Sequence, residues 1–126
     1  MNKCTFYQEF IYLYLVKTPT YQLRPTANFK KELKHLSKKY PSILEDVEAL
    51  GAKLIIDPVM GESLGNGFYK IRVAVTSKGK GKSGGARLIT NVVIVNAIVY
   101  LISIYDKSEK ESMPLSELRA ILKTIL

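Results

Sequence analysis

The sequence predicts an α+β domain in which helices pack on one side of a small antiparallel sheet. Residues 27–40 and 43–56 carry apolar side chains at helical spacing. They precede three segments rich in β-branched residues, 68–76, 86–95 and 97–105, and an amphipathic segment ends the chain. Because helices and strands occur in separate runs, the predicted order is β-α-α-β-β-β-α, with two helices on one side and a short C-terminal helix.

Composition limits the classes of function. The 126 residues suit a single domain, and the net charge of +8 is high for that size. The single cysteine excludes a disulfide within the chain and fits a reducing compartment, so we expect a cytoplasmic protein. With one histidine and one cysteine the usual zinc ligand sets cannot be assembled, and we expect no metal and no cofactor.

Residues 1–20 are interpreted as an N-terminal extension, and residues 21–126 as the folded domain. The apolar run 10–16 is too short to span a bilayer, and no membrane association is expected. Residues 17–20 lack the small residues of a signal-peptide cleavage site. The extension is therefore interpreted as an extra strand, or as a disordered stretch from an upstream start codon.

The first elements have clear local signals. Residues 21–24 read as a short strand that Pro25 stops, and Thr26 can cap the helix that follows. That helix has one apolar face, with lysines on its other sides. Its apolar residues are Phe29, Leu33, Leu36 and Tyr40.

The second helix is predicted to begin after Pro41, with Ser42 as its cap and Glu45 as the partner in a capping box. Residues 59–67 are predicted to form a loop that ends in the turn Gly65-Asn66-Gly67. The buried face of the helix is expected to consist of Ile43, Leu44, Val47, Leu50 and Leu54.

A basic stretch follows the turn, and residues 67–90 contain no acidic residue. Strand alternation over 68–76 places Lys70 and Arg72 on one face, and glycines over 79–85 predict a loop to the next strand. Such concentrated positive charge predicts a surface for a polyanion. The six cations are Lys70, Arg72, Lys78, Lys80, Lys82 and Arg87.

The triplet Gly81-Lys82-Ser83 resembles the end of a phosphate-binding P-loop. The first glycine of that motif would fall at Thr76, and the residues that follow read as a strand instead of a helix. Nucleotide hydrolysis is therefore disfavoured.

The last two strands, 86–95 and 97–105, are predicted to join at a tight turn on Asn96, and the second is apolar on both faces, as in a central strand. Pro114 opens the final helix. Its inward face is expected to comprise Leu115, Leu118, Ile121, Leu122 and Ile125.

Three motifs together carry a family resemblance: GNGFYKIR at 65–72, KGKGKSGGAR at 78–87 and YLISIYDK at 100–107. In this order the chain resembles the RelE/ParE superfamily of toxins from type II toxin–antitoxin systems, and within it the HigB-like, RelE-type group. The resemblance covers about residues 21–126, and the joined motifs are far more specific than any one of them.

The resemblance implies a ribosome-dependent endoribonuclease that cleaves messenger RNA without a metal and so inhibits translation. It places Arg87 at the scissile phosphate, with Lys107 near a second catalytic arginine of the family. It implies that Lys70, Lys78 and Asp106 contact RNA. No tyrosine of the last helix matches the one that some members use, and Tyr105 is the nearest substitute. The implied catalytic set is Arg72, Lys80, Lys82, Arg87, Tyr105 and Lys107.

The residues agree with such chemistry. Attack by a 2′-hydroxyl needs a base, cations for the phosphate and an acid for the leaving oxygen. With one histidine, a histidine pair cannot supply the base and acid. Lys80 or Lys82, with a pKa lowered by neighbouring cations, is a candidate base, as is Asp106. Arg72 and Arg87 would hold the phosphate from one face of the sheet, and Arg87, which opens its strand, is expected to face outward as an exposed side chain.

The resemblance implies as partners an antitoxin of the helix-turn-helix kind, encoded by the neighbouring gene, together with the 70S ribosome and messenger RNA. Two other functions remain open. One is a ParE-like, non-catalytic inhibitor of a topoisomerase, although the dense basic set at 70–87 disfavours it. The other is a decayed toxin that only binds nucleic acid, which the lysine at position 107 keeps open.

Overall fold

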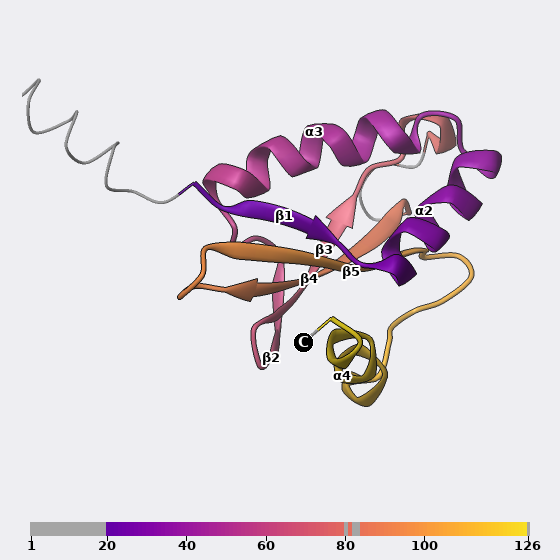
Figure 1. Ribbon diagram of the computed structural model, residues 1–126. Helices are drawn as coiled ribbons and strands as arrows, with labels where there is room; N and C mark the ends of the chain where they lie inside the picture. The colour runs from indigo at the N-terminus through magenta and orange to yellow at the C-terminus, as the bar shows by residue number, and fades with distance from the viewer. Residues whose placement is uncertain (1–19, 80, 82–83, 126) are drawn as a thin grey trace, which may run out of the picture.

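The computed structural model describes residues 20–79, 81 and 84–125. They form one five-stranded sheet with the strand order β1-β5-β4-β3-β2. Two helices lie on one face of the sheet and a third lies on the other (Figure 1). The α+β class predicted from the sequence is confirmed, and the N-terminal extension proposed for residues 1–20 lies almost wholly outside the described residues.

The sheet has one short parallel edge. Strand β1 (Gln22–Pro25) runs parallel to β5 (Ile98–Asp106), which occupies the second position in the sheet. The pairs β5–β4 and β4–β3 are antiparallel, with β4 spanning Ala86–Val93 and β3 spanning Phe68–Val73. The sheet is therefore mixed. The two helices that follow β1 carry the chain from this edge of the sheet to β2 at the opposite edge.

Strand β2 (Glu62–Gly65) was not predicted, since residues 59–67 were expected to be a loop. It pairs antiparallel with β3, and Asn66 and Gly67 form the connecting turn with φ angles of 55° and 81°. An Asn-Gly pair adopts these left-handed values readily, as expected of a tight hairpin. The ladder stops at the Glu62–Lys70 pair, so the rest of β3 extends beyond β2.

Helix α2 (Ala27–Lys39) begins as predicted, with the Thr26 hydroxyl accepting a hydrogen bond from the Phe29 amide. Helix α3 (Ile43–Ile56) begins differently. Ser42 has helical backbone angles, and its side chain accepts no hydrogen bond from an amide of the first turn of the helix. The predicted capping box is therefore wrong. The Ser42 hydroxyl instead bonds to Ser77 and Asp46.

The core has two layers, one on each face of the sheet. Phe29 and Leu36 of α2 and Ile43 and Leu54 of α3 pack on one face. Leu44, expected on the buried side of α3, is 53% exposed, so that prediction is wrong.

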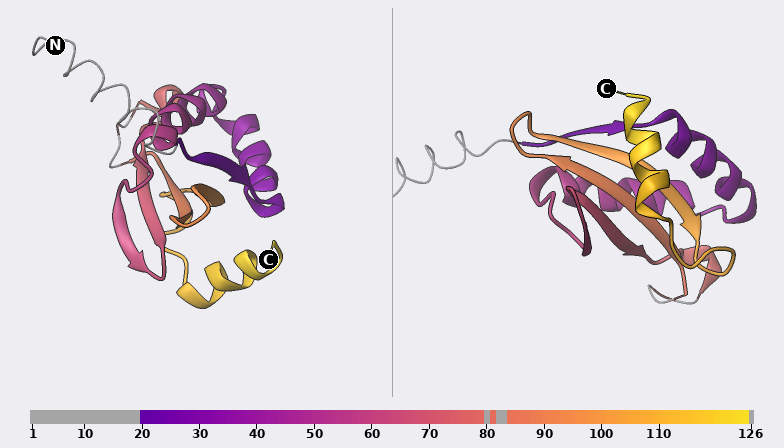
Figure 2. Two further views of the ribbon diagram at one scale, coloured as in Figure 1. Left: turned by 60° about the vertical axis from the view of Figure 1, so that its left-hand side comes forward. Right: turned by 90° about the horizontal axis from the view of Figure 1, so that it is seen from below.

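Helix α4 (Leu115–Lys123) lies on the other face of the sheet (Figure 2). Its residue Leu118 packs there with Phe68, Ile102 and Tyr105. The C-terminal helix therefore lies opposite α2 and α3, the two helices that were predicted to pack on one side.

The β4–β5 connection is longer than predicted. The strands end at Val93 and restart at Ile98, and the left-handed residue is Ala97, with φ of 53°, instead of Asn96. The Ala97 amide donates to the Ile94 carbonyl, closing the turn. In β5 all nine residues are buried, as expected of an interior strand.

Candidate functional site

Three predicted site residues form a row across the sheet. Arg72 of β3 is the direct partner of Arg87 in β4, and Arg87 is the direct partner of Tyr105 in β5. Directly opposed residues of antiparallel strands project from the same face. Tyr105 packs among the residues under α4, so the row lies on the α4 face of the sheet. The sequence prediction that Arg72 and Arg87 share a face is consistent with this register.

The two arginines differ in exposure. Arg72 is exposed, whereas Arg87 is only 4% exposed and donates from Nη1 to the Ala86 carbonyl at 3.0 Å. Burial, with a smaller contribution from the Arg72 charge, lowers the pKa of Arg87 from its ordinary value. Arg87 was expected to face outward as an exposed side chain, and that expectation is wrong. The site therefore holds a buried guanidinium beside a solvent-facing one.

Tyr105 also lies in a buried environment. Its hydroxyl has no hydrogen-bond partner among the described residues, and burial raises its pKa, although the Arg87 charge acts in the opposite direction. At neutral pH the hydroxyl is protonated and can donate a hydrogen bond or a proton. Lys110 lies over the ring, 5.7 Å from its centroid.

A cleft of about 1090 Å³ brings four of the predicted residues together: Lys70, Arg72, Arg87 and Lys107. The Lys70 amine pairs with Glu62 of β2 at 3.7 Å. The Lys107 amide donates to the Gly85 carbonyl, which fixes the chain after β5 beside the start of β4. Residues from three separate parts of the chain therefore supply cations to one concave surface.

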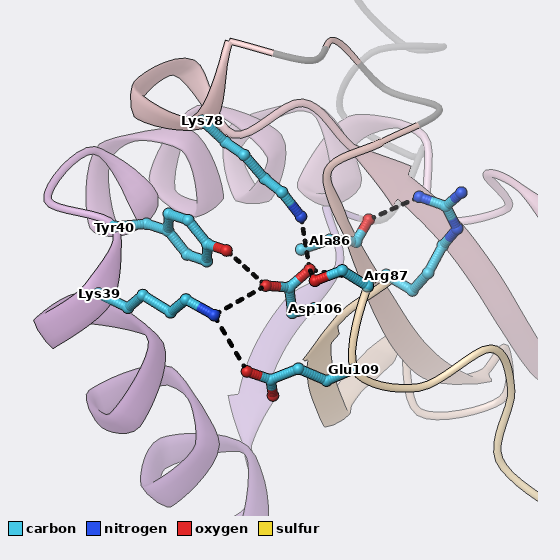
Figure 3. A network of polar contacts seen from close by, with 8 residues as sticks. Lys39, Tyr40, Lys78, Ala86, Arg87, Asp106 and Glu109 are labelled. Carbon is cyan, nitrogen blue, oxygen red and sulfur yellow. Dashed lines mark hydrogen bonds and ion pairs between the residues drawn. The ribbon is translucent and has the colours of Figure 1, made fainter.

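Lys78 and Asp106, both predicted to contact RNA, form an ion pair with each other (Figure 3). The amine and carboxylate lie 2.6 Å apart, with the two side chains 9% and 1% exposed. The Tyr40 hydroxyl and the Ser108 amide and hydroxyl also donate to Asp106, and Lys39 lies 3.8 Å away. This network ties the 3₁₀ helix η1 (Thr76–Lys78) to the end of β5.

The network decides the protonation of Asp106. Burial opposes its ionisation, but the hydrogen bonds from Lys78, Tyr40 and Ser108 outweigh burial and hold its pKa well below the usual range. A carboxylate with so low a pKa is a weak proton acceptor at neutral pH. The surroundings of Asp106 therefore favour a structural role over the role of general base.

A second set of contacts anchors η1 to α3. Asp46 accepts hydrogen bonds from the Thr76 amide and hydroxyl, and the Ser77 amide donates to the Ser42 hydroxyl. Burial acts against ionisation of Asp46, yet these bonds lower its pKa overall. The start of the basic loop is thus fixed on two sides, while Lys80 and Lys82 lie outside the described residues.

Four charged residues that line the cleft were not among the predicted site residues. Asp46 and Lys53 of α3 and Glu62 and Glu111 also line it. No local pattern in the sequence indicated that these four residues lie beside the basic strands. In the described part of the chain, no group of three or more His, Cys, Asp or Glu could hold a metal ion. No described helix is long and apolar enough to cross a membrane.

No protein-family model matches the chain. Among solved structures, it is similar to the toxin RelE of E. coli. A free-state double mutant of RelE matches with a TM-score of 0.55 and 21% identity over 85% of this chain and 99% of that chain. The isolated RelE toxin matches with a TM-score of 0.54 and 20% identity over 84% and 99%. This confirms the RelE-like fold that the sequence motifs implied.

Proposed function

We propose that this protein is the toxin of a type II toxin–antitoxin system and cleaves messenger RNA on the ribosome. The observation that carries the proposal is the pairing of Arg72 with Arg87 on neighbouring strands, at a cleft that Lys70 and Lys107 also line. Four cations around one concave surface suit a phosphodiester. The RelE-like fold supports a toxin of this class.

The reaction is an internal transfer. The 2′-oxygen of a ribose attacks the adjacent phosphorus, the bond from phosphorus to the 5′-oxygen breaks, and the products carry a 2′,3′-cyclic phosphate and a 5′-hydroxyl. Charge grows on the phosphoryl oxygens in the transition state. Arg72 and Arg87 would bind those oxygens, and the burial of Arg87 supports this role because little water is there to screen its charge.

Two proton transfers accompany the attack. The protonated hydroxyl of Tyr105, opposite Arg87, is the candidate donor to the leaving 5′-oxygen. The 2′-hydroxyl proton needs an acceptor, and the described cleft offers the exposed carboxylates of Glu62 and Glu111. Lys80 and Lys82 remain candidates from the sequence, outside the described residues.

The proposed partners follow from the charge. With a net charge of +8, the chain suits an antitoxin whose inhibitory segment is acidic. The same charge favours ribosomal RNA as the surface on which the toxin meets its message.

A translating extract tests the proposal. Purified protein is added to an extract that translates one defined message, and the 5′ ends of that message are mapped. We expect new ends with 5′-hydroxyls within the translated region and none when initiation is blocked. Intact message together with retained RNA binding would favour the nucleic-acid-binding alternative.

A further inference from the structure

The cleft continues past the four predicted cations to helix α3. Strand β2 pairs with β3 as far as Glu62 and Lys70, whereas β3 continues to Val73. The outer edge of β3 beyond Lys70 therefore opens onto the cleft. Arg72, Val73 and Ala74 line it from this edge, and Leu50 and Lys53 of α3 line it from the other side.

The far part of the cleft combines an apolar floor with a cation. Leu50 and Met60 are half-buried and pack against the core beside buried Ile71. Lys53 is exposed and projects from α3, which borders the cleft. Aliphatic side chains offer a surface for a nucleobase, and an amine beside them offers a partner for a phosphate.

The charges of the lining favour an anion. Five cations line the cleft, Lys53, Lys70, Arg72, Arg87 and Lys107, against three carboxylates, Asp46, Glu62 and Glu111, which leaves +2. Asp46 is occupied by Thr76 and Ser42, and Glu62 pairs with Lys70. The volume of about 1090 Å³ is above the roughly 300–1,000 Å³ of pockets for drug-sized ligands, so the cleft has room beyond a single phosphate.

We propose that this part of the cleft is a second nucleotide subsite. The base of a nucleotide next to the scissile phosphate lies over Leu50, Met60 and Ile71, and its phosphate lies at Lys53. The inference rests on the proposed function in one respect, that the ligand is RNA. It adds that α3 takes part in holding the message, and that the base at this position contributes to affinity.

Binding of short RNA to the isolated full-length chain tests the subsite. The probes are 2′-O-methyl trinucleotides, which cannot be cleaved, with each base in turn replaced by an abasic residue. The proteins are wild type, Lys53→Ala and Lys31→Ala. Lys31 is an exposed lysine of α2 outside the cleft lining, so it controls for the loss of one charge.

We expect Lys53→Ala to weaken binding about tenfold more than Lys31→Ala does. It should also reduce the slope of log affinity against log salt by about 0.7, as for one lost phosphate contact on a single strand. One abasic position should weaken binding to wild type. Equal effects of the two alanine variants, or indifference to every abasic position, would overturn the subsite.

The same measurement separates this inference from the proposed function. If wild type does not cleave message but Lys53→Ala lowers RNA affinity more than Lys31→Ala does, the subsite is supported and the proposed nuclease activity is not. If wild type cleaves message and the two lysine variants bind alike, the nuclease stands and the subsite does not. A third outcome is that Lys53→Ala weakens the binding of a polyglutamate peptide but not the binding of RNA. This result would also overturn the subsite, in favour of a peptide ligand.

Discussion

Arg72 and Arg87 lie directly opposite each other in the β3–β4 ladder, so two guanidinium groups share one face of the sheet. Like charges opposed across strands destabilise a sheet. Burial and the Arg72 charge both lower the pKa of Arg87, which means that the fold disfavours its cationic form. A bound phosphate would relieve this repulsion, and such a cost in stability is common at functional sites.

Replacing Arg87 by methionine keeps an aliphatic side chain in the buried position and removes the charge. Because the native surroundings disfavour that charge, while the substitution also removes the hydrogen bond to the Ala86 carbonyl, we expect Arg87→Met to melt close to wild type and message cleavage to fall by about a hundredfold or more. Thermal unfolding and end mapping on the same preparation check this. A melting temperature several degrees lower would show that Arg87 is mainly a structural residue.

The hydroxyl of Tyr105 gives a second test. It is buried without a partner among the described residues, so its removal should not destabilise the fold. We expect Tyr105→Phe to unfold at the same urea concentration as wild type and to cleave message about a hundredfold more slowly, since a proton donor would be lost. Unchanged cleavage would remove Tyr105 from the catalytic set.

The ion pair of Lys78 and Asp106 should stabilise the fold. Removing one partner of a buried pair leaves the other uncompensated, so Asp106→Leu should lower the free energy of unfolding by about 3 kcal/mol. The double variant Lys78→Met with Asp106→Leu should lose less than the two single variants together. Urea unfolding of the four proteins measures the coupling, and additive losses would contradict it.

Stability should fall in acid. The pKa of Asp106 is depressed from 3.8 in the folded chain, and that of Asp46 is also lowered. A carboxyl group whose pKa is lower in the folded chain than in the unfolded chain stabilises the fold at pH values above its unfolded-state pKa. This stabilisation is lost as the pH falls through its folded-state pKa. The loss should develop from about pH 5 downward. Asp106→Asn should show a shallower decline by urea unfolding between neutral and acid pH, and a parallel decline would contradict this.

Local patterns predicted most of the elements. The spacing of Phe29, Leu33 and Leu36 indicated α2, and Thr26 caps it because its hydroxyl reaches an amide three residues on. Alternation placed Lys70 and Arg72 on one face of β3. These signals act between residues close in sequence, so no tertiary information was needed.

Long-range contacts were beyond the reach of such patterns. Ser42 has the sequence of a cap, but its hydroxyl bonds to Ser77, 35 residues away. Asp106 follows a strand beside basic residues, yet its partners Lys78 and Tyr40 draw it into a buried network. Lys53 lies in the predominantly acidic part of the chain, and only the packing of α3 beside β3 brings it to the cleft.

The most direct test of the central claim compares Arg72→Ala with wild type in the translating extract. Arg72 is exposed, so the substitution should change stability by no more than about 0.5 kcal/mol. Arg24→Ala, on the opposite edge strand β1, controls for the loss of one exposed arginine. The account predicts that the single-turnover rate of message cleavage falls about a hundredfold for Arg72→Ala and stays unchanged for Arg24→Ala. Equal rates for the two variants, with both proteins folded, would contradict it.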